Sequence, residues 1–295
     1  MRAAVDGGIT LIDTAPMYLN CEQVILAAFD GRPPAHLRFT SKCRLGTPPR
    51  GEITERLRRS VEASLLAMGL AHIDLFFLHT NIRADDYVFA VRPDRQDVFS
   101  TTWSCYAQEF IPAMQAMQRS GKIGHWGITG IGVPAMIDRA LNAESRPAAV
   151  QAVANLLDSA GGMKNFAESQ APRAIIATAA SNGVGVMGIR AVQAGALTAS
   201  IDRDLPPDHP EMRDYVRAEP FRALCRDLGE DPADIAHRYA LSMAGVDTVV
   251  LGVKNRAELR RCLDAEAAGV LDPALVSRID SLIQGGPNEA TPTRL

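Results

Sequence analysis

Short apolar segments recur along the chain, and a stretch with helical spacing follows most of them. The spacing is clearest in residues 52–69, where Ile53, Leu57, Val61 and Leu65 recur on one helical face. Seven segments have the length and composition of buried strands: 9–13, 37–42, 73–79, 123–129, 148–153, 184–189 and 247–251. Strands that alternate with helices form a mostly parallel sheet covered by helices. The pattern predicts an α/β fold, best met by a (β/α)8 TIM barrel without its first strand; an open doubly wound sheet is the alternative.

The chain is long enough for one α/β barrel or for two ordinary domains. It has 295 residues, of which 47% are hydrophobic, and shows no internal repeat, low-complexity tract or domain boundary. We therefore predict a single barrel domain over 1–295, with irregular loops near the site at 81–104 and 200–218 and a tail at 284–295. Because a helix tail occupies the first five residues, we expect that a segment which normally precedes it is missing, through a misplaced start or a real truncation.

Charge and cysteine content exclude several classes of protein. The net charge of −3 gives no bulk attraction to nucleic acid or to an anionic membrane, and no apolar run approaches the roughly 18 residues of a membrane helix. The cysteines are odd in number and scattered, without a CxxC pair, which argues against a disulfide framework or a metal site. We predict a cytoplasmic protein without a metal. The cysteines are Cys21, Cys43, Cys105, Cys225 and Cys262.

Four polar side chains follow the first three predicted strands. Asp13 and Tyr18 lie at and just beyond the end of strand 9–13, Lys42 ends strand 37–42, and His79 ends strand 73–79. The carboxyl ends of parallel barrel strands meet at one rim, so we expect the four side chains to converge there. Each residue alone has an ordinary structural explanation. Together they predict an active site, because a lysine and an aspartate near buried strands need each other.

The chain resembles the aldo-keto reductase family from Met1 to about residue 283. The stretch from Asp13 to Tyr18 matches the family's DTAxxY motif, and Lys42 and His79 follow in the family's order. Three later segments also match: Gly121 to Gly130 as the entry to the fifth strand, Gln151 with Asn155-Leu156-Leu157 as the sixth-strand motif, and Val250 to Asn255 as the phosphate-binding turn. The resemblance implies a barrel that reduces a small aldehyde or ketone to an alcohol with a nicotinamide cofactor.

The resemblance also implies a role for each of the four residues. Tyr18 would donate the proton to the carbonyl oxygen, and the Lys42 ammonium would lower the pKa of this phenol. Asp13 would pair with Lys42 and keep it charged. His79 would donate a hydrogen bond that orients the carbonyl and stabilises the developing oxyanion.

Two groups of residues are the cofactor candidates. Thr129, Gln151 and Asn155 would hold the carboxamide, and Gly252, Lys254, Asn255 and Arg256 the phosphates at the start of a helix. The basic side chains favour NADP (NADPH) over NAD. Five positions depart from the family's pattern and weaken the cofactor prediction: Leu19, Ile189 (or beside it Arg190), Glu258, Arg261 and Cys262.

Two other hypotheses stay open. The altered cofactor positions suit a catalytically weak or inactive cofactor-binding subunit on the same fold, although a complete catalytic quartet argues against it. The missing first strand suits a truncated chain that does not function, since an open barrel exposes two sheet edges. Phe99 and Trp103, in the loop at 81–104, either line the substrate site or pin the loop.

Overall fold

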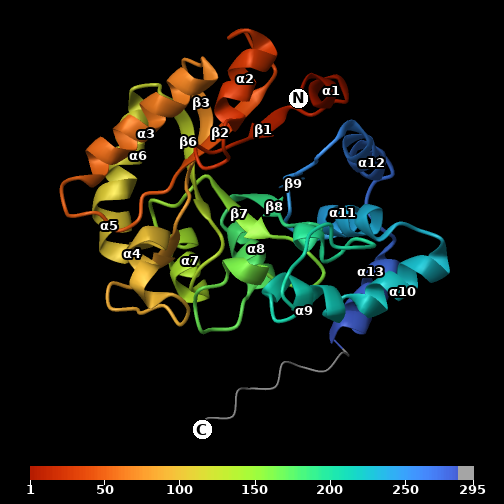
Figure 1. Cartoon of the computed structure of the whole chain (residues 1–295). Helices are drawn as coiled ribbons and strands as arrows, with labels where there is room; N and C mark the ends of the chain where they lie inside the picture. Colours follow the sequence, from red (N-terminus) through yellow and green to blue (C-terminus); the bar gives the residue numbers. More distant parts are fainter. Residues whose placement is uncertain (285–295) are drawn as a thin grey trace. The chain divides into compact units, whose positions relative to one another are not determined.

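The computed structural model describes residues 1–284. It contains a seven-stranded sheet whose paired strands run parallel (Figure 1). The strands lie side by side in the order in which they occur along the chain. A doubly wound sheet reverses its strand order at a switch point, so that alternative was wrong and the α/β fold of TIM-barrel type is confirmed. The strands, in sheet order, are β1 (Leu11–Asp13), β2 (Arg38–Cys43), β3 (Ile73–Leu78), β6 (Ile123–Thr129), β7 (Ala149–Val153), β8 (Gly185–Ile189) and β9 (Thr248–Val249).

The chain divides into two compact units. The first comprises residues 1–152 and 164–186, and the second comprises 153–163 and the residues from 187 onwards. The single domain expected over 1–295 stays a prediction. From residue 285 on, the tail expected at 284–295 lies outside the described residues.

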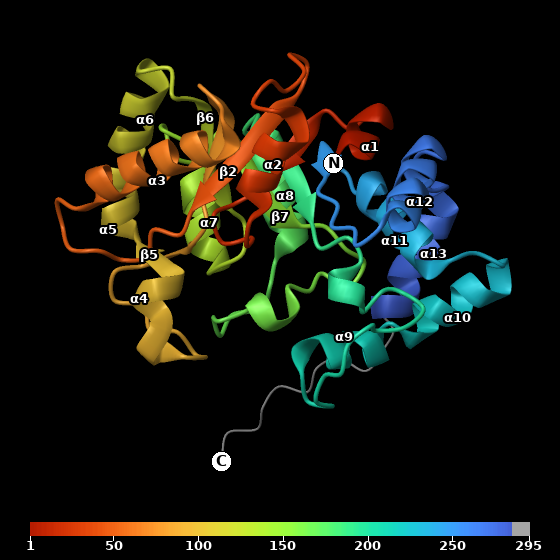
Figure 2. The ribbon, with the colours of Figure 1, turned by 45° about the horizontal axis from the view of Figure 1, so that its top comes forward.

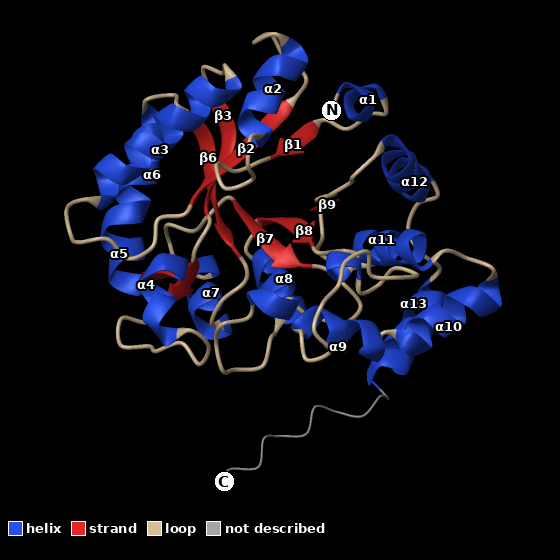
Figure 3. Cartoon of the chain, viewed as in Figure 1, coloured by secondary structure: helices blue, strands red, loops and turns tan. Residues whose placement is uncertain are grey.

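In the first unit, helices cover the strands on one side, as the separate colours of helix and strand show in Figure 3. Helix α3 illustrates the cause: Ile53, Leu57 and Val61 are fully buried on one face, as the sequence spacing predicts. The helix ends at Gly69, whose φ of +66° is left-handed and where an added Cβ would lie 2.5 Å from Leu26 Cδ1. The helices are α1 (Arg2–Asp6), α2 (Cys21–Phe29), α3 (Ile53–Met68), α6 (Ile111–Arg119), α7 (Pro134–Leu141) and α8 (Pro172–Ser181).

The segment at 81–104 is ordered, and the expectation of an irregular loop was wrong. Strands β4 (Asn81–Arg83) and β5 (Ser100–Thr102) form a separate parallel pair, and η1 (Pro93–Arg95) and α4 (Gln96–Phe99) lie between them. The buried Arg83 guanidinium holds the segment together, donating to Ser100 Oγ at 2.9 Å, to Asp97 at 2.7 Å and to three backbone carbonyls. Strands of three residues are too short to show a sequence period.

Beyond β5 the chain winds into α5 (Trp103–Cys105) and a π-helical turn, η2 (Tyr106–Phe110), that runs into α6. Trp103 packs 5.4 Å from the Tyr106 ring, between ring centroids, and the Arg139 guanidinium of α7 lies 3.9 Å above it. Trp103 therefore pins the segment to its neighbouring helices.

The second unit is mainly helical. Helix α11 (Pro232–Ser242) lies beside α12 (Arg256–Ala267), and α10 (Glu219–Leu228) lies beside α13 (Pro273–Gln284), as the turned view in Figure 2 also shows. Two short turns, η3 (Gly161–Met163) and η4 (Gln193–Gly195), complete it. No helix within residues 1–284 has the length and apolar character that a membrane span needs.

The insertion expected to be irregular at 200–218 contains a helix, α9 (Pro210–Arg217). Its buried Asp214 accepts hydrogen bonds from Ser159 Oγ at 2.7 Å and Gln193 Nε2 at 2.6 Å. Its Glu211 pairs with Arg190 at 3.0 Å. These polar bonds dock the helix within the second unit.

Candidate active site

A buried ion pair forms the base of the candidate site in the first unit. Lys42 Nζ lies 2.6 Å from Asp13 Oδ2, and the lysine side chain is 0% exposed. The same nitrogen donates to the Thr14 carbonyl at 2.9 Å. Strand pairing explains the meeting, because β1 and β2 are parallel neighbours and Asp13 is opposite Thr40, two positions before Lys42 and on the same face of β2.

Tyr18 and His79 complete the cluster. The Tyr18 hydroxyl lies 3.4 Å from His79 Nε2, the two rings meet edge to face, and Lys42 Nζ lies 4.8 Å from the centre of the Tyr18 ring. His79 follows β3 directly, and its backbone N–H donates to the Cys43 carbonyl of β2 at 2.8 Å. The structure thus brings all four predicted side chains together at the carboxyl ends of β1, β2 and β3.

Burial and neighbouring charges set the protonation states. Burial, with the positive charges of Lys42 and Arg44, lowers the pKa of His79 to about 4, so the imidazole is neutral near pH 7. Burial and the negative charge of Asp13 raise the pKa of Tyr18 to about 12. Burial also lowers the pKa of Lys42, and the Asp13 carboxylate opposes that effect.

The expected lowering of the Tyr18 pKa by Lys42 is absent from this arrangement. Burial of the phenol is the main reason. Asp13 adds to it, because its carboxylate pairs with the Lys42 ammonium and so offsets the positive charge that would have favoured the phenolate. Tyr18 is therefore a neutral proton donor throughout the physiological pH range.

Two of the predicted carboxamide ligands make hydrogen bonds within the first unit. Gln151 Nε2 donates to Asp13 Oδ1 at 2.7 Å, and Thr129 Oγ1 donates to the Leu78 carbonyl at 3.0 Å. Together with Thr40 Oγ1, which donates to Asp13 at 2.5 Å, Gln151 orients the carboxylate toward Lys42. Gln151 thus touches the catalytic cluster, and its role toward a cofactor stays a prediction.

The third predicted carboxamide ligand, Asn155, belongs to the second unit. Its side chain is fully buried, donates to the carbonyls of Ser159 and Arg190 and to Gln193, and accepts from the Leu157 and Ser159 N–H groups. These partners occupy both ends of the amide. The structure places Asn155 in a network that fixes the turn after β7.

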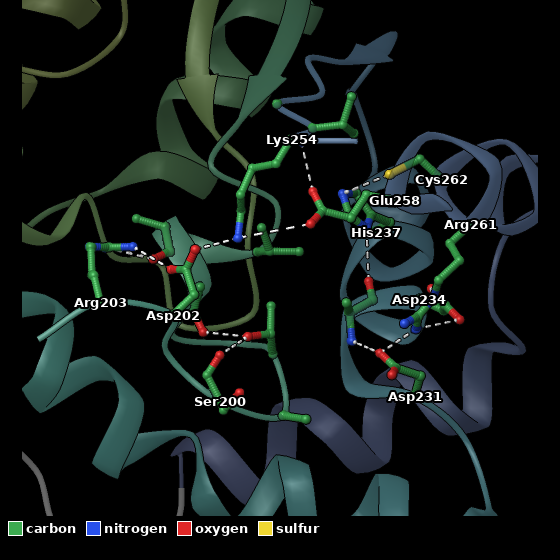
Figure 4. Close-up of a pocket in the computed structure, with 18 residues that line it drawn as sticks. Ser200, Asp202, Arg203, Asp231, Asp234, His237, Lys254, Glu258, Arg261 and Cys262 are labelled. Atoms are coloured by element: carbon green, nitrogen blue, oxygen red, sulfur yellow. Dashed lines mark hydrogen bonds and ion pairs between the residues drawn. The ribbon is translucent and has the colours of Figure 1, made fainter. Parts of the chain in front are cut away.

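A pocket of about 470 Å³ in the second unit is lined by two of the four predicted phosphate ligands (Figure 4). Gly252 and Lys254 line it, in the turn between β9 and α12. An added Cβ on Gly252 would meet no atom within 4 Å, so the backbone is open to a ligand here. Pockets of this size take cofactors, and a helix that begins after the last barrel strand suits a phosphate, so these residues fit the predicted dinucleotide.

Acidic side chains already engage the basic groups of this pocket. The Lys254 ammonium pairs with Asp202 and lies 3.9 Å from Glu258, and Arg261 pairs with Asp231 at 2.6 Å and Asp234 at 3.0 Å (Figure 4). The hydrogen bond from Lys254 to Asp202 raises the pKa of Lys254. An incoming phosphate would therefore compete with carboxylates.

Asn255 caps the start of helix α12, and the Glu258 side chain bonds back to the turn before it. The Asn255 side chain accepts from the Glu258 N–H at 2.9 Å, and the Glu258 carboxylate accepts from the Lys254 N–H at 2.8 Å. Glu258, one of the positions that depart from the family's pattern, therefore has a structural role in this turn. The predicted ligand Arg256 is exposed at the first position of the helix.

The residues at 1–284 include no group of side chains that could hold a metal ion, and three of their cysteines have a raised thiol pKa. No three His, Cys, Asp or Glu side chains there gather to hold a metal ion. Burial raises the pKa of Cys43, Cys225 and Cys262, which keeps those thiols protonated.

The sequence reasoning missed several residues of this site. Thr40 carried a signal, since it stands two positions before Lys42 on one strand and so shares its face. The carboxylate partner of Lys254, Asp202, carried none, because 52 positions of irregular sequence and helices separate the two. Arg44 was also missed, and it contacts Met17, the neighbour of Tyr18, at 3.6 Å from Nη1 to Sδ.

Two curated dehydrogenases are similar to this chain over most of its length. The chain is 21% identical to L-galactose dehydrogenase of Arabidopsis thaliana, with 99% of this chain and 86% of the relative covered. It is 25% identical to D-threo-aldose 1-dehydrogenase of a Pseudomonas species, with 93% and 83% covered.

Among solved structures, the fold matches the glycerol dehydrogenase AKR11B4 of Gluconobacter oxydans with a TM-score of 0.70 at 20% identity, covering 100% of this chain and 87% of that one. It matches the holo form of aldo-keto reductase AKR11C1 of Bacillus halodurans with a TM-score of 0.67 at 19% identity, covering 95% and 85%. The model of the aldo/keto reductase family matches residues 1–284, and the chain therefore belongs to that family of oxidoreductases acting on CH–OH and C=O groups.

Proposed function

We propose that this protein catalyses the reversible, NADPH-dependent reduction of a small aldehyde or ketone to an alcohol, with Tyr18 as the proton donor. The observation that carries the proposal is the cluster in the first unit. There the Tyr18 hydroxyl lies 3.4 Å from His79 Nε2, beside the buried pair of Lys42 and Asp13. We place the activity in the cytoplasm, because the scattered cysteines of the sequence favour a reducing compartment.

The neutral imidazole of His79 orients the substrate. With its single proton on Nε2, the ring donates a hydrogen bond to the carbonyl oxygen and stabilises the negative charge that develops there. Its pKa of about 4 keeps it in this state at neutral pH. The reduced nicotinamide, when bound, supplies the hydride to the carbonyl carbon.

Tyr18 supplies the proton to the carbonyl oxygen. The phenolate left behind faces the Lys42 ammonium, whose nitrogen lies 4.8 Å from the ring centre and limits the cost of that charge. Tyr18 is 39% exposed, so solvent can return its proton. In the reverse direction the phenolate takes the proton of the alcohol.

The choice of NADPH rests on the basic residues of the second unit. Lys254 and Arg256 lie at the start of α12, where the helix dipole also favours an anion. Asp202 and Glu258 oppose this preference, so binding of a 2′-phosphate would have to draw Lys254 away from Asp202.

Replacing Tyr18 by phenylalanine tests the proposal. We expect Tyr18→Phe to reduce NADPH oxidation across a panel of aldehydes by about 100-fold or more, because the proton donor is lost. The dissociation constant of NADPH, followed by protein fluorescence, should change less than about threefold.

Tyr87→Phe is the matched control, since it removes a phenol of the first unit that donates to Glu168 at 2.7 Å, outside the cluster. Turnover in Tyr18→Phe equal to that of Tyr87→Phe would contradict the assignment. If the wild-type protein binds NADPH but does not oxidise it with any carbonyl compound of the panel, the result would favour the cofactor-binding subunit instead.

A further inference from the structure

Three arginines surround the ring of Phe99 in the first unit. The guanidinium carbons of Arg44, Arg95 and Arg92 lie 4.7, 4.9 and 5.5 Å from the ring centroid. Each distance is within the range of a cation–π contact, so one half-buried aromatic ring organises three positive charges. We call Arg44, Arg92, Arg95 and Phe99 the arginine cluster.

None of these three arginines forms an ion pair within residues 1–284. Arg44 contacts Met17 Sδ, and Arg92 donates to the Asn165 carboxamide oxygen at 2.8 Å. The nearby Asp97 is taken by Arg83, at 2.7 Å. Other arginines of the chain contrast with them, since Arg58 and Arg261 each hold two carboxylates.

The arginine cluster adjoins the catalytic residues. Arg44 follows β2 two positions after Lys42, and its Nη1 lies 3.6 Å from the sulfur of Met17, the residue before Tyr18. Its charge also reaches His79, where it adds to the lowering of the pKa by burial and by Lys42. Arg44 therefore links the arginine cluster to the segment that carries Tyr18 and to His79.

Like charges that share one site repel, and a bound anion would relieve that repulsion. A planar guanidinium suits this purpose, because it can donate two parallel hydrogen bonds to a carboxylate or a phosphate. The net charge of the chain is −3, so the arginine cluster is a local departure from an acidic protein.

We propose that the substrate is a carbonyl compound with an anionic group, a carboxylate or a phosphate, which the arginine cluster binds while Tyr18 and His79 hold the carbonyl. This inference rests on the proposed reductase activity. It sets the protein apart from the similar dehydrogenases, whose names give uncharged substrates: L-galactose, D-threo-aldoses and glycerol.

Paired substrates that differ only in the anion test the proposal. One pair is 4-oxobutanoate and butanal; the other is glyceraldehyde 3-phosphate and glyceraldehyde. We expect kcat/KM to favour the anionic member of at least one pair by about tenfold or more, in keeping with a charge-assisted hydrogen bond. The pair with the larger ratio identifies the carboxylate or the phosphate.

Substitutions of Arg44 assign the effect to the arginine cluster. Arg44→Gln should lower the preference by about tenfold, mainly through KM, and Arg44→Lys should keep part of it. The assays are run at pH 8, where His79 is neutral with or without Arg44. The control, Arg32→Gln, removes an exposed arginine in the loop before β2, at the opposite end of that strand, and should leave the ratio unchanged.

A binding measurement separates this inference from the proposed function. Saturation-transfer NMR compares 4-hydroxybutyrate with 1-butanol, and phosphoglycerol with glycerol, in the wild type and in Arg44→Gln. Preferential, Arg44-dependent binding of an anion without turnover of any carbonyl would support the arginine cluster and contradict the reductase. Turnover of both pairs without an anionic preference, or a preference that survives in Arg44→Gln, would overturn the inference and leave the reductase standing.

Discussion

Gln151 donates a hydrogen bond to Asp13 across 2.7 Å, although 138 positions separate the two in the chain. Thr40 donates to the same carboxylate oxygen, and Lys42 to the other one. Three donors from β2 and β7 therefore fix one carboxylate of β1. This arrangement keeps the buried Lys42 charged and directed at Tyr18.

We expect Asp13→Asn to lower the free energy of unfolding by about 3–5 kcal/mol, because it leaves the buried Lys42 ammonium without its carboxylate. The double variant Asp13→Asn with Lys42→Met removes both charges and should recover part of this loss. Urea unfolding of the two single variants and the double variant gives the coupling energy. A double variant no more stable than Asp13→Asn would show that the ion pair does not account for the loss.

The pH dependence of carbonyl reduction should be flat from about pH 6 to pH 8. Reduction needs a protonated Tyr18, whose pKa is about 12, and a neutral His79, whose pKa is about 4, so neither group titrates in this window. The window ends at pH 8 because burial lowers the pKa of Lys42, whose charge the reaction also uses. Alcohol oxidation needs the phenolate and should rise about tenfold per pH unit over the same range. Steady-state kcat/KM at saturating cofactor checks both; a limb of the reduction profile near pH 7 would contradict the pKa values of Tyr18 and His79.

Asp202→Asn should raise the affinity for NADPH by about three- to tenfold and leave that for NADH nearly unchanged. The substitution removes the carboxylate that engages Lys254, so the ammonium becomes available to a 2′-phosphate. Fluorescence titration with both cofactors measures the two constants. Asp204→Asn, at an exposed aspartate two positions on, is the control for charge alone. Equal gains in the two variants would place the effect in net charge rather than in Lys254.

Leu19→Gly should raise the free energy of unfolding by about 0.5–1 kcal/mol. Leu19 has a φ of +55°, in the left-handed region that costs a residue with a Cβ, and its side chain is 93% exposed. Glycine removes the strain without loss of packing. Chemical denaturation with Leu19→Ala as the comparison measures the effect: Leu19→Ala keeps the strain and should gain nothing.

The sequence could predict most of the sheet because each long strand is a buried apolar run. β3 and β6 match their predicted segments to within one residue. The meeting of Asp13, Tyr18, Lys42 and His79 was equally predictable, since parallel strands bring their carboxyl ends together whatever the loops do. Strands β4 and β5 escaped prediction because a strand of three residues is too short to show an alternation of apolar and polar side chains. The Arg83 hydrogen bonds that hold this segment together join positions 17 or fewer apart, in no pattern that the sequence reveals.

The charges around the site were harder to foresee. Lys42 and Tyr18 suggested a lowered phenol pKa, and burial of the phenol, with the negative charge of Asp13, reversed the direction. Arg44, Arg92 and Arg95 looked like ordinary surface residues until the fold placed all three around Phe99. Electrostatic effects depend on distances between side chains of different elements, and sequence spacing fixes those distances only within a strand or a helix.

The carboxylate of Glu258 ties coenzyme choice to the fold of the turn before α12. Because this carboxylate accepts the Lys254 N–H, a mutation that removed the acid to welcome a phosphorylated dinucleotide would also remove that hydrogen bond, at a cost of about 0.5–1.5 kcal/mol. An evolutionary change of preference from NADH to NADPH through Glu258 would therefore need a second, compensating substitution elsewhere in the second unit.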